Sequence, residues 1–324
     1  MTWIYPNVSN SASLIHIRLA TLADAAAICA IHVSNIDRWQ TDTAHPARYT
    51  DLTPYQRWRH GGPWLDLGTC AQHLQRFLNG GGLAFVAEAG GRVVAAAELS
   101  LADEPLPYGR NLNLNTLYVH RNHQGRGFGS ALLQHALNLA SQLRCDTFQI
   151  ANAEAPDFYK RHDLKLTEHW ARVQVSLGSI HRSTPTTRPL SDGTYDLVRG
   201  QALLIGRHQN AQHDWERTRP NAGPDFAEWR HLKLERHTLT VNRHNIPFGD
   251  PAQIIYEEDP DHPAVANLFL FTQAGFNREL FSAVRQLGSQ LGFTHLHCLI
   301  RSDLKLPGAT PTDYAQTLFA KRLR

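Results

Sequence analysis

The segment His120–Ser130 constrains the fold of this chain more than any other part of the sequence. It follows an apolar strand pattern that ends at Val119, contains three alternating glycines, and runs into apolar residues at helical spacing over Ala131–Leu143. Glycine lets the backbone pass close to a ligand, and the first amides of a helix attract anions. A strand, a glycine loop and a helix in this order therefore predict a site for a phosphate-bearing ligand.

Two common phosphate-binding loops do not fit this segment. A Walker A loop needs Gly-Lys-Ser or Gly-Lys-Thr, and neither tripeptide occurs in the chain. The dinucleotide-binding loop needs a glycine where Ser130 stands, and it opens an alternating series of parallel strands and helices. Here Leu83–Glu88 and Arg92–Leu101 instead predict a β-hairpin with a Gly-Gly turn. Both loop types are therefore excluded.

The elements around the glycine loop predict a mixed sheet with helices, an α/β or α+β fold. Strand segments alternate apolar and polar residues, whereas helical segments carry apolar residues on one face. In chain order we expect a strand at 15–19, helices at 21–33 and 70–78, strands at 83–88, 92–101 and 111–119, a helix at 131–143, and a strand at 144–151.

A second motif follows the last of these strands. The spacing Asn-x-x-Ala-x-x-Phe-Tyr runs from Asn152 to Tyr159, and Gln124–Gly129 has the spacing Gln-x-x-Gly-x-Gly. In this order, separated by one helix and one strand, the two motifs resemble the acetyl-CoA site of the GNAT family of N-acetyltransferases. The resemblance covers about residues 15–177, with Asp163-Leu164 standing where the family usually has Gly-Phe.

This resemblance implies acetyl-CoA as co-substrate and a set of residues that bind it. The backbone of Leu117, Tyr118 and Val119 would pair with the pantetheine arm like an added strand. Asn152 would hydrogen-bond to the same arm. Tyr159 would protonate the departing thiolate as a general acid, the other reading being an ordinary tyrosine beside the core. The loop would hold the pyrophosphate through Gln124, Gly125, Arg126, Gly127, Phe128, Gly129 and Ser130.

Acetyl transfer to an amine also requires a group that removes a proton from the ammonium form. A strand carboxylate or an ordered water chain can do so, and burial raises the pKa of a carboxylate toward the useful range. Glu98 is the candidate base, although an outward-facing strand residue is the alternative reading of the same position. Glu88 and Asn113 are weaker candidates, and backbone N–H groups near Val119 could stabilise the oxyanion.

The second half of the chain repeats the order of elements of the first half. A stretch rich in Ser, Thr and Pro at 178–193 predicts a linker, so we expect one domain at 1–177 and a second at 194–324. The second domain resembles a degenerate GNAT copy, because 271–278 lacks the Gln-x-x-Gly-x-Gly spacing. Its expected elements are strands near 232–242, 252–257 and 264–272, a helix at 277–291, a strand at 294–300, and a last helix near Pro311–Arg322.

Charge and composition narrow the class of protein further. The chain has 32 basic and 29 acidic residues among 324, which argues against a nucleic-acid partner. Four widely spaced cysteines predict buried free thiols in a reducing cytoplasm. Neither His120-x-x-His123 nor His295-x-His297 has the further ligands of a zinc site, so no metal is expected. We also find no signal peptide or membrane span.

These patterns predict a cytoplasmic, acetyl-CoA-dependent N-acetyltransferase that acts on a primary amine of a small molecule or peptide. A non-catalytic acetyl-CoA sensor or partner-binding module is the alternative from another class, and transfer of a larger acyl group is a third. The aromatic and acidic stretch Asp37–Asp66 fits a cationic amine, because rings and carboxylates attract cations, but helix packing explains it equally well.

Overall fold

The computed structural model describes residues 15–41, 45–178, 186–190, 192–243, 246–247, 250–273 and 275–324. The chain forms two compact units that are not contiguous in sequence. The first unit comprises residues 1–100, 114–144 and 223–226, and the second comprises 101–113, 145–222 and 227–324.

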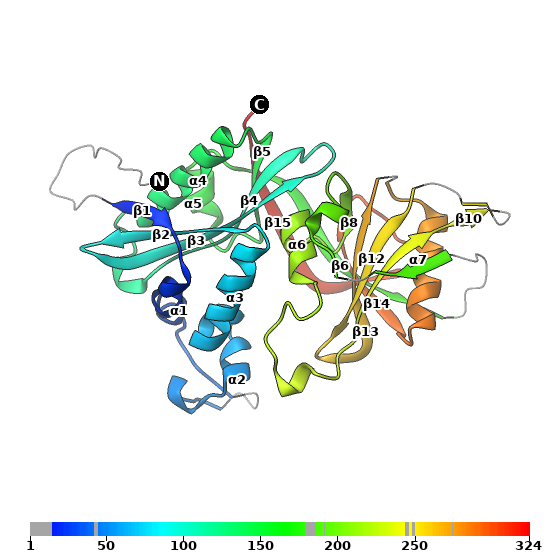
Figure 1. Ribbon diagram of the computed structural model, residues 1–324, viewed down its shortest axis with the longest axis horizontal. Helices are drawn as coiled ribbons and strands as arrows, with labels where there is room; N and C mark the ends of the chain where they lie inside the picture. Colours follow the sequence, from blue (N-terminus) through cyan, green and yellow to red (C-terminus); the bar gives the residue numbers. More distant parts are fainter. Residues whose placement is uncertain are drawn as a thin grey trace. The chain divides into compact units, whose positions relative to one another are not determined.

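The first unit is a sheet in which β1, β2, β3 and β4 are neighbours in that order. Figure 1 shows α1 and α3 on one side of these strands and α4 on the other. Apolar residues of α1, α3 and the strands, such as Ile28, Leu74 and Val86, form one core cluster. The elements are β1 His16–Leu19, α1 Ala25–Val33, α2 Pro54–Trp58, α3 Leu67–Asn79, β2 Leu83–Ala89, β3 Arg92–Asp103, β4 Arg110–Val119 and α4 Phe128–Gln142, with 3-10 turns at Leu22–Asp24, Tyr49–Asp51, Pro63–Leu65 and Arg121–His123.

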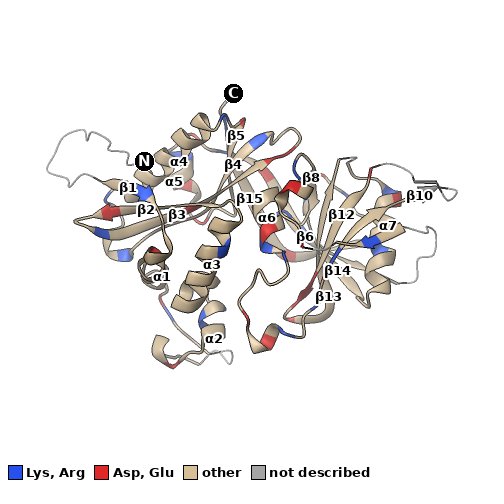
Figure 2. Cartoon of the chain, viewed as in Figure 1, with Lys and Arg blue, Asp and Glu red and all other residues tan. Residues whose placement is uncertain are grey.

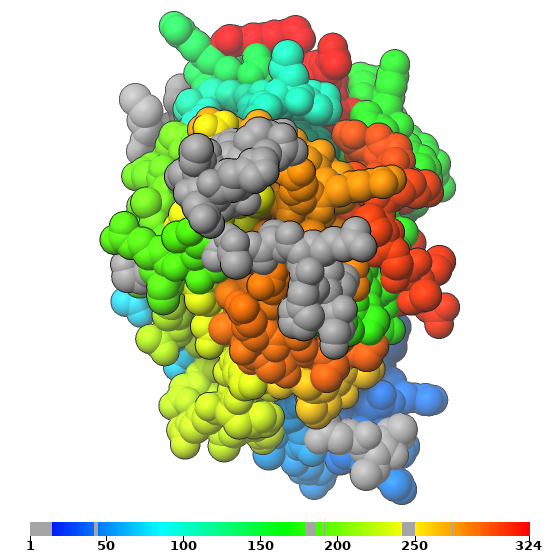
Figure 3. Space-filling view, turned by 90° about the vertical axis from the view of Figure 1, so that its right-hand side faces the viewer, coloured from blue at the N-terminus to red at the C-terminus, as the bar shows by residue number. Residues whose placement is uncertain are grey.

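The second unit is a larger sheet with the strand order β5-β15-β6-β14-β13-β12-β9-β7. Helix α7 packs its apolar side, including Phe281 and Val284, on Ile254 and Leu268 of the sheet. The orange residues of α7 lie on the face of the molecule that Figure 3 shows. The elements are β5 Thr147–Ala151, α5 Pro156–Lys160, β6 Lys165–Ser176, β7 Thr186–Pro189, β8 Ala202–Ile205, α6 Ala211–Arg217, β9 Leu234–Thr240, β10 Asn242–Arg243, β11 Ile246–Pro247, β12 Ala252–Asp259, β13 His262–Thr272, α7 Arg278–Gln290, β14 His295–Arg301 and β15 Ala309–Arg322, with 3-10 turns at Tyr195–Leu197 and Ala227–Trp229.

The end of the chain is a strand, and the expected helix near Pro311–Arg322 is wrong. Strand β15 pairs antiparallel with β5 on one edge and with β6 on the other, and Ala320 has a partner on both. The threonines of this segment suit a strand. Pro311 has no N–H to donate to a neighbouring strand, and the pairing with β6 shifts register directly after it. Pairing on two edges therefore decides the structure of a segment whose apolar spacing is compatible with a helix.

The segment expected to link two domains contains a strand. Thr186–Pro189 form β7, which pairs antiparallel with β9. The rest of the linker prediction includes 179–185 and 191, which lie outside the described residues. The two compact units do not divide near residues 178–193, where the linker is expected. Strand β15, near residue 324, lies between β5 and β6, so these early strands belong to the same unit as the last part of the chain.

The second unit contains two parallel strand pairs, each three residues long. Strand β4 pairs with β5 from Asn111↔Thr147 to Asn113↔Gln149, and β13 pairs with β14 from Val265↔His295 to Asn267↔His297. Beyond the second pair, β8 lies antiparallel to β13, and the N–H of Gly206 donates to the Leu299 carbonyl at 2.8 Å. Gly206 has φ +90°, and a Cβ there would lie 2.5 Å from the Leu268 carbonyl oxygen, so this approach requires glycine.

The prediction that the four cysteines are buried free thiols is confirmed. Cys29, Cys70, Cys145 and Cys298 are all buried and none forms a disulfide. Within the described ranges, none of the helices has both the length and the apolar character needed to cross a membrane.

Candidate active site

The glycine loop has the geometry that its sequence predicts. Gly125 and Gly127 have φ angles of +73° and +87°, a conformation that favours glycine. No atom lies within 4 Å of the place where a Cβ would stand on either residue, so the space beside the loop is open. Gly127 is the N-cap of α4. The backbone of this turn can therefore approach a ligand closely.

The start of α4 supplies the amides of a candidate anion site. Hydrogen bonding within this 15-residue helix begins where the N–H of Ala131 donates to the Gly127 carbonyl at 2.9 Å. The preceding amides, Phe128 to Ser130, stand at the positive end of the helix dipole. Phe128 is buried and anchors the turn, whereas Arg126 is exposed beside it. The residues assigned to the pyrophosphate thus fit an anionic phosphate group and lie together in one turn.

Gln124 is engaged within the protein. Its Nε2 donates to Oδ1 of Asn35 at 2.8 Å and approaches the Val119 carbonyl at 3.4 Å. Nδ2 of Asn35 donates to the same carbonyl at 3.2 Å. The side chain of Gln124 therefore ties the loop to the end of β4 and to the segment after α1, which makes it a positioning residue for the loop.

Glu98 is buried, and the alternative reading of an outward-facing residue is wrong. The residue is 3% exposed, because helices α1 and α3 cover this face of β3. Its carboxylate accepts hydrogen bonds from Nε1 of Trp64 at 2.9 Å and from Nε2 of His73 at 3.0 Å. Burial opposes ionisation, but the charge of His73 and the hydrogen bonds from His73 and Trp64 outweigh it, so the pKa of Glu98 is lowered. Glu98 is therefore an ionised carboxylate inside the first unit.

A row of stacked rings joins Glu98 to the strand that was assigned to the pantetheine arm. The ring of Tyr118 lies 4.3 Å from His32, and His32 stacks on Trp64 at 5.2 Å. Trp64 meets His73 edge to face at 4.9 Å. Burial lowers the pKa of His32 to about 4, so this ring is neutral at physiological pH.

Most of the remaining aromatic residues of Asp37–Asp66 serve packing. Trp39 contacts Tyr49 at 5.0 Å and His60 at 4.8 Å between ring centroids. Tyr55 packs on Phe226, which also belongs to the first unit. Among these rings, Trp64 hydrogen-bonds to a candidate catalytic residue, Glu98.

The two weaker candidate bases have other partners. Glu88 binds Arg18 through Nε at 2.7 Å and His16 through Nδ1 at 3.1 Å. Asn113 is buried in the second unit, where its Nδ2 donates to Gln209 at 2.7 Å. Neither geometry favours proton removal from a substrate.

Asn152, Tyr159 and the end of the second motif belong to the second unit. Asn152 is exposed with φ +53°, and its N–H donates to the Thr317 carbonyl of β15 at 2.8 Å. Tyr159 is 8% exposed, and burial, together with Glu154, raises the pKa of its phenol to about 12. Asp163 adopts φ +62°, so the turn keeps the backbone conformation that the family's usual glycine favours.

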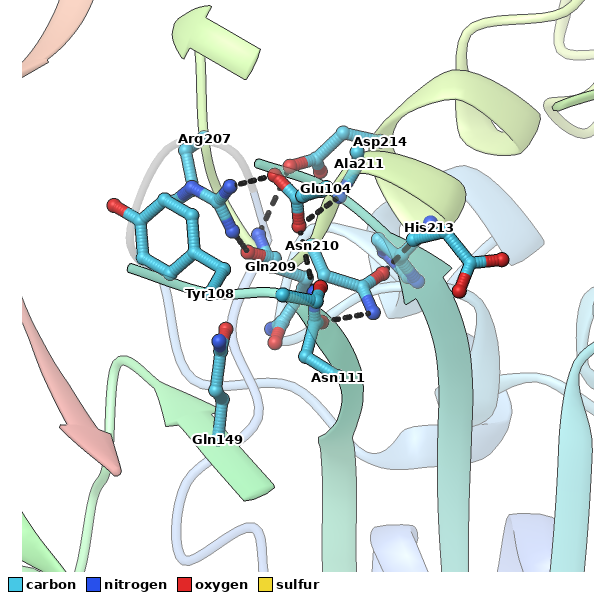
Figure 4. A network of polar contacts seen from close by, with 12 residues as sticks. Glu104, Tyr108, Asn111, Gln149, Arg207, Gln209, Asn210, Ala211, His213 and Asp214 are labelled. Atoms are coloured by element: carbon cyan, nitrogen blue, oxygen red, sulfur yellow. Dashed lines mark hydrogen bonds and ion pairs between the residues drawn. The ribbon is translucent and has the colours of Figure 1, made fainter. Parts of the chain in front are cut away.

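The sequence prediction missed a buried polar network in the second unit (Figure 4). Glu104 and Arg207 form an ion pair in which both side chains are fully buried. Nδ2 of Asn111 donates to Glu104 at 3.0 Å, and the Arg207 guanidinium lies 4.0 Å from the ring centre of Tyr108. Arg207 lies about 100 positions after the other three residues and none of the four falls in a motif, so pattern reasoning had no signal for the network.

The same network extends toward α6. Nδ2 of Asn210 donates to Oδ1 of Asn111 at 3.0 Å, and Asp214 accepts from the N–H groups of His208 and Gln209. Burial raises the pKa of Asp214 to about 6. Beside this loop, a cavity of about 110 Å³ is lined by residues that include Arg172, His208, His297 and Tyr314. Such a volume holds roughly three water molecules.

The histidine pairs have local roles. His120 caps a 3-10 turn, and Nδ1 of His297 lies 3.2 Å from Asp259. Over the described ranges, no group of three or more His, Cys, Asp or Glu residues could hold a metal ion. Figure 2 shows basic and acidic residues interspersed along both units.

Comparison with known proteins identifies the family. A model described as the acetyltransferase (GNAT) family matches residues 43–163. A tRNA-acetylating toxin of Mycobacterium tuberculosis is 31% identical over 140 residues, which cover 38% of this chain and 84% of the toxin. The chain belongs to the GNAT family of acetyltransferases.

Solved structures show the same fold at low sequence identity. A GCN5-related N-acetyltransferase of Anabaena variabilis has a TM-score of 0.56 at 11% identity, covering 80% of this chain and 67% of that one. A probable N-acyltransferase of Enterococcus faecalis has a TM-score of 0.57 at 9% identity, with coverages of 96% and 72%. The predicted fold class, a mixed sheet of the acyl-CoA N-acyltransferase type, is confirmed.

Proposed function

We propose that this protein is an acetyl-CoA-dependent N-acetyltransferase that acetylates a primary amine. The observation that carries the proposal is the glycine loop before α4, whose left-handed Gly125 and Gly127 open onto free space in a chain of the GNAT family. A backbone turn of this kind at a helix start suits a pyrophosphate. Acetyl-CoA supplies the activated acetyl group as a thioester.

The proposed binding residues follow the loop and its two flanking motifs. The amides from Gly125 to Ser130 bind the pyrophosphate, with Arg126 adding a positive charge. The backbone of Leu117–Val119 and the side chain of Asn152 bind the pantetheine arm. The exposure of Asn152 and Arg126 supports these assignments, because both side chains are open to a ligand.

The proposed chemistry is direct attack by the amine. The acceptor loses a proton to the region of Glu98, and Tyr159 donates a proton to the leaving thiolate. Burial raises the pKa of Tyr159 to about 12, so the phenol holds its proton at neutral pH before the reaction begins. Buried free thiols suit a reducing compartment, so we place the protein in the cytoplasm.

The acceptor that we propose first is an amine of a small molecule or peptide, because the chain carries a net charge of only +3. An amine carried by tRNA is the second candidate. It is favoured by one observation, the 31% identity to a protein named for acetylating tRNA.

We also propose that 1–177 is the catalytic domain, that 178–193 connects it, and that 194–324 is a decayed copy. The matching three-residue parallel pairs, β4 with β5 and β13 with β14, support a repeated plan. Strand β8 lies along β13 beyond its pair, which argues against a second cofactor site there.

The test is thiol release from acetyl-CoA with small amines, peptides and tRNA, followed by mass spectrometry of the product. We expect turnover with one class of amine, and Tyr159→Phe should lower kcat by about 10²–10³-fold while acetyl-CoA still binds. Tyr314→Phe, a change of the same size in the second unit, should keep the wild-type rate. Tight binding of acetyl-CoA without turnover on any amine would instead identify a sensor.

A further inference from the structure

His73 and Glu98 form a pair in which Glu98 is almost fully buried and His73, whose ring also stacks on Phe77, is partly exposed. Nε2 of His73, on α3, lies 3.0 and 3.2 Å from the two carboxylate oxygens of Glu98 on β3. The Glu98 side chain is 4% exposed and that of His73 is 20% exposed. Nδ1 of His73 makes no hydrogen bond within the described residues. An ionised carboxylate only accepts, so Nε2 of His73 donates to Glu98, and in the neutral form of the ring Nδ1 carries the lone pair.

The pair lies beside the strand that we assign to the pantetheine arm. The N–H of His120 donates to the Val94 carbonyl at 2.8 Å, and Oγ of Ser100 hydrogen-bonds to Asn115 at 2.8 Å. Glu98 lies between Val94 and Ser100 on β3, so its neighbours on β4 fall between Asn115 and His120. Leu117–Val119 are inside this interval.

We propose that His73 is the group that accepts the proton of the acceptor amine, and that Glu98 is a positioning residue that orients its ring. This inference rests on the proposed acetyltransferase function. The class of acceptor is an amine that arrives as an ammonium ion, because the lone pair of His73 lies next to the negative charge of Glu98. Its catalytic logic is that of a carboxylate–histidine pair, in which the carboxylate stabilises the imidazolium.

The proton and electron balance of the step is complete. The ammonium gives one proton to Nδ1 of His73, which becomes an imidazolium held by Glu98. The freed amine lone pair forms the bond to the acetyl carbon, the carbon–sulfur bond breaks, and sulfur leaves with the electron pair. Tyr159 supplies the proton that sulfur takes up. The nitrogen still carries one surplus proton once the bond to carbon has formed, and it gives that proton to water to become the neutral amide nitrogen. The imidazolium loses its proton to water and the tyrosinate regains one, so each turnover releases one proton.

Glu98 is less suited to take this proton itself. Both of its oxygens already accept hydrogen bonds, from Trp64 and His73, and the carboxylate is almost fully buried. The other titratable groups that pack against the pair are His32 of α1 and Cys70 of α3. His32 is buried between two rings, and burial raises the pKa of Cys70 to about 12, so neither competes for the proton at neutral pH.

The test compares His73→Gln with a matched control in the same unit. We expect kcat to fall by about 10²–10³-fold with the KM for acetyl-CoA unchanged. Imidazole in solution should restore part of the rate to His73→Ala. The matched control is His16→Gln. Nδ1 of His16 lies 3.1 Å from a carboxylate oxygen of Glu88, so this variant also removes a histidine–glutamate pair, but it should leave kcat unchanged.

A second variant keeps the test decisive where His73→Gln fails to fold. Glu98→Gln preserves size, and under the proposal it lowers kcat with the KM for acetyl-CoA unchanged, because the imidazolium formed during the reaction loses its anionic partner. Wild-type kcat in folded His73→Gln, or wild-type kcat in Glu98→Gln, would overturn the role of His73 and leave the acetyltransferase proposal standing. Absence of turnover in the wild-type protein would instead overturn the proposed function.

Discussion

The Glu104–Arg207 pair illustrates how this chain buries charge. Both side chains are fully excluded from solvent, which costs several kcal/mol for each ion before compensation. The compensation comes from Asn111, which donates to Glu104, from Tyr108 beneath the guanidinium, and from the ion pair itself. Neither charge can therefore be removed without leaving the other uncompensated.

At this scale we predict that Glu104→Gln destabilises the protein by about 3–5 kcal/mol, because Arg207 remains buried without its counter-ion. Urea unfolding followed by fluorescence measures the change. Asp196→Asn is the control, since this exposed partner of Arg199 should contribute less than about 1 kcal/mol. An equal, small effect of both substitutions would show that Arg207 is satisfied by other means.

Local patterns predicted most elements well, and long-range pairing explains the main failure. The glycine loop, the hairpin β2–β3 and helix α4 follow from glycine positions and periodicity in one stretch of chain. Strand β15 does not, because its structure depends on β5 and β6, more than 130 residues earlier. Likewise, the burial of Glu98 depends on α1 and α3 covering β3, which strand alternation alone does not reveal.

The role of β15 leads to a prediction at the level of the element. A chain that ends at Gly308 lacks the strand between β5 and β6, and we expect it to aggregate or unfold, because two strand edges lose their partner. A chain that ends at Leu323 keeps the whole strand and should unfold at the wild-type temperature. Soluble expression of the shorter chain with an unchanged thermal transition would contradict this role of β15.

At the scale of the whole molecule, the family and the cofactor loop could be predicted from sequence, whereas the reacting groups could not. Two motifs in order sufficed to predict the GNAT family and its fold. The pairing of Glu98 with His73 and Trp64 joins three separate elements and required the folded chain. The network around Arg207 likewise joins residues about 100 positions apart.

Calorimetric titration of acetyl-CoA shows whether the glycine loop and the start of α4 bind this ligand. We predict binding to the wild-type protein and at least about tenfold weaker binding to Gly127→Val, since valine is strained at φ +87°. Gly308→Val imposes similar strain at φ +74° in the second unit and should bind normally. No binding to the wild-type protein, or equal binding by Gly127→Val, would contradict the proposal that the glycine loop binds acetyl-CoA.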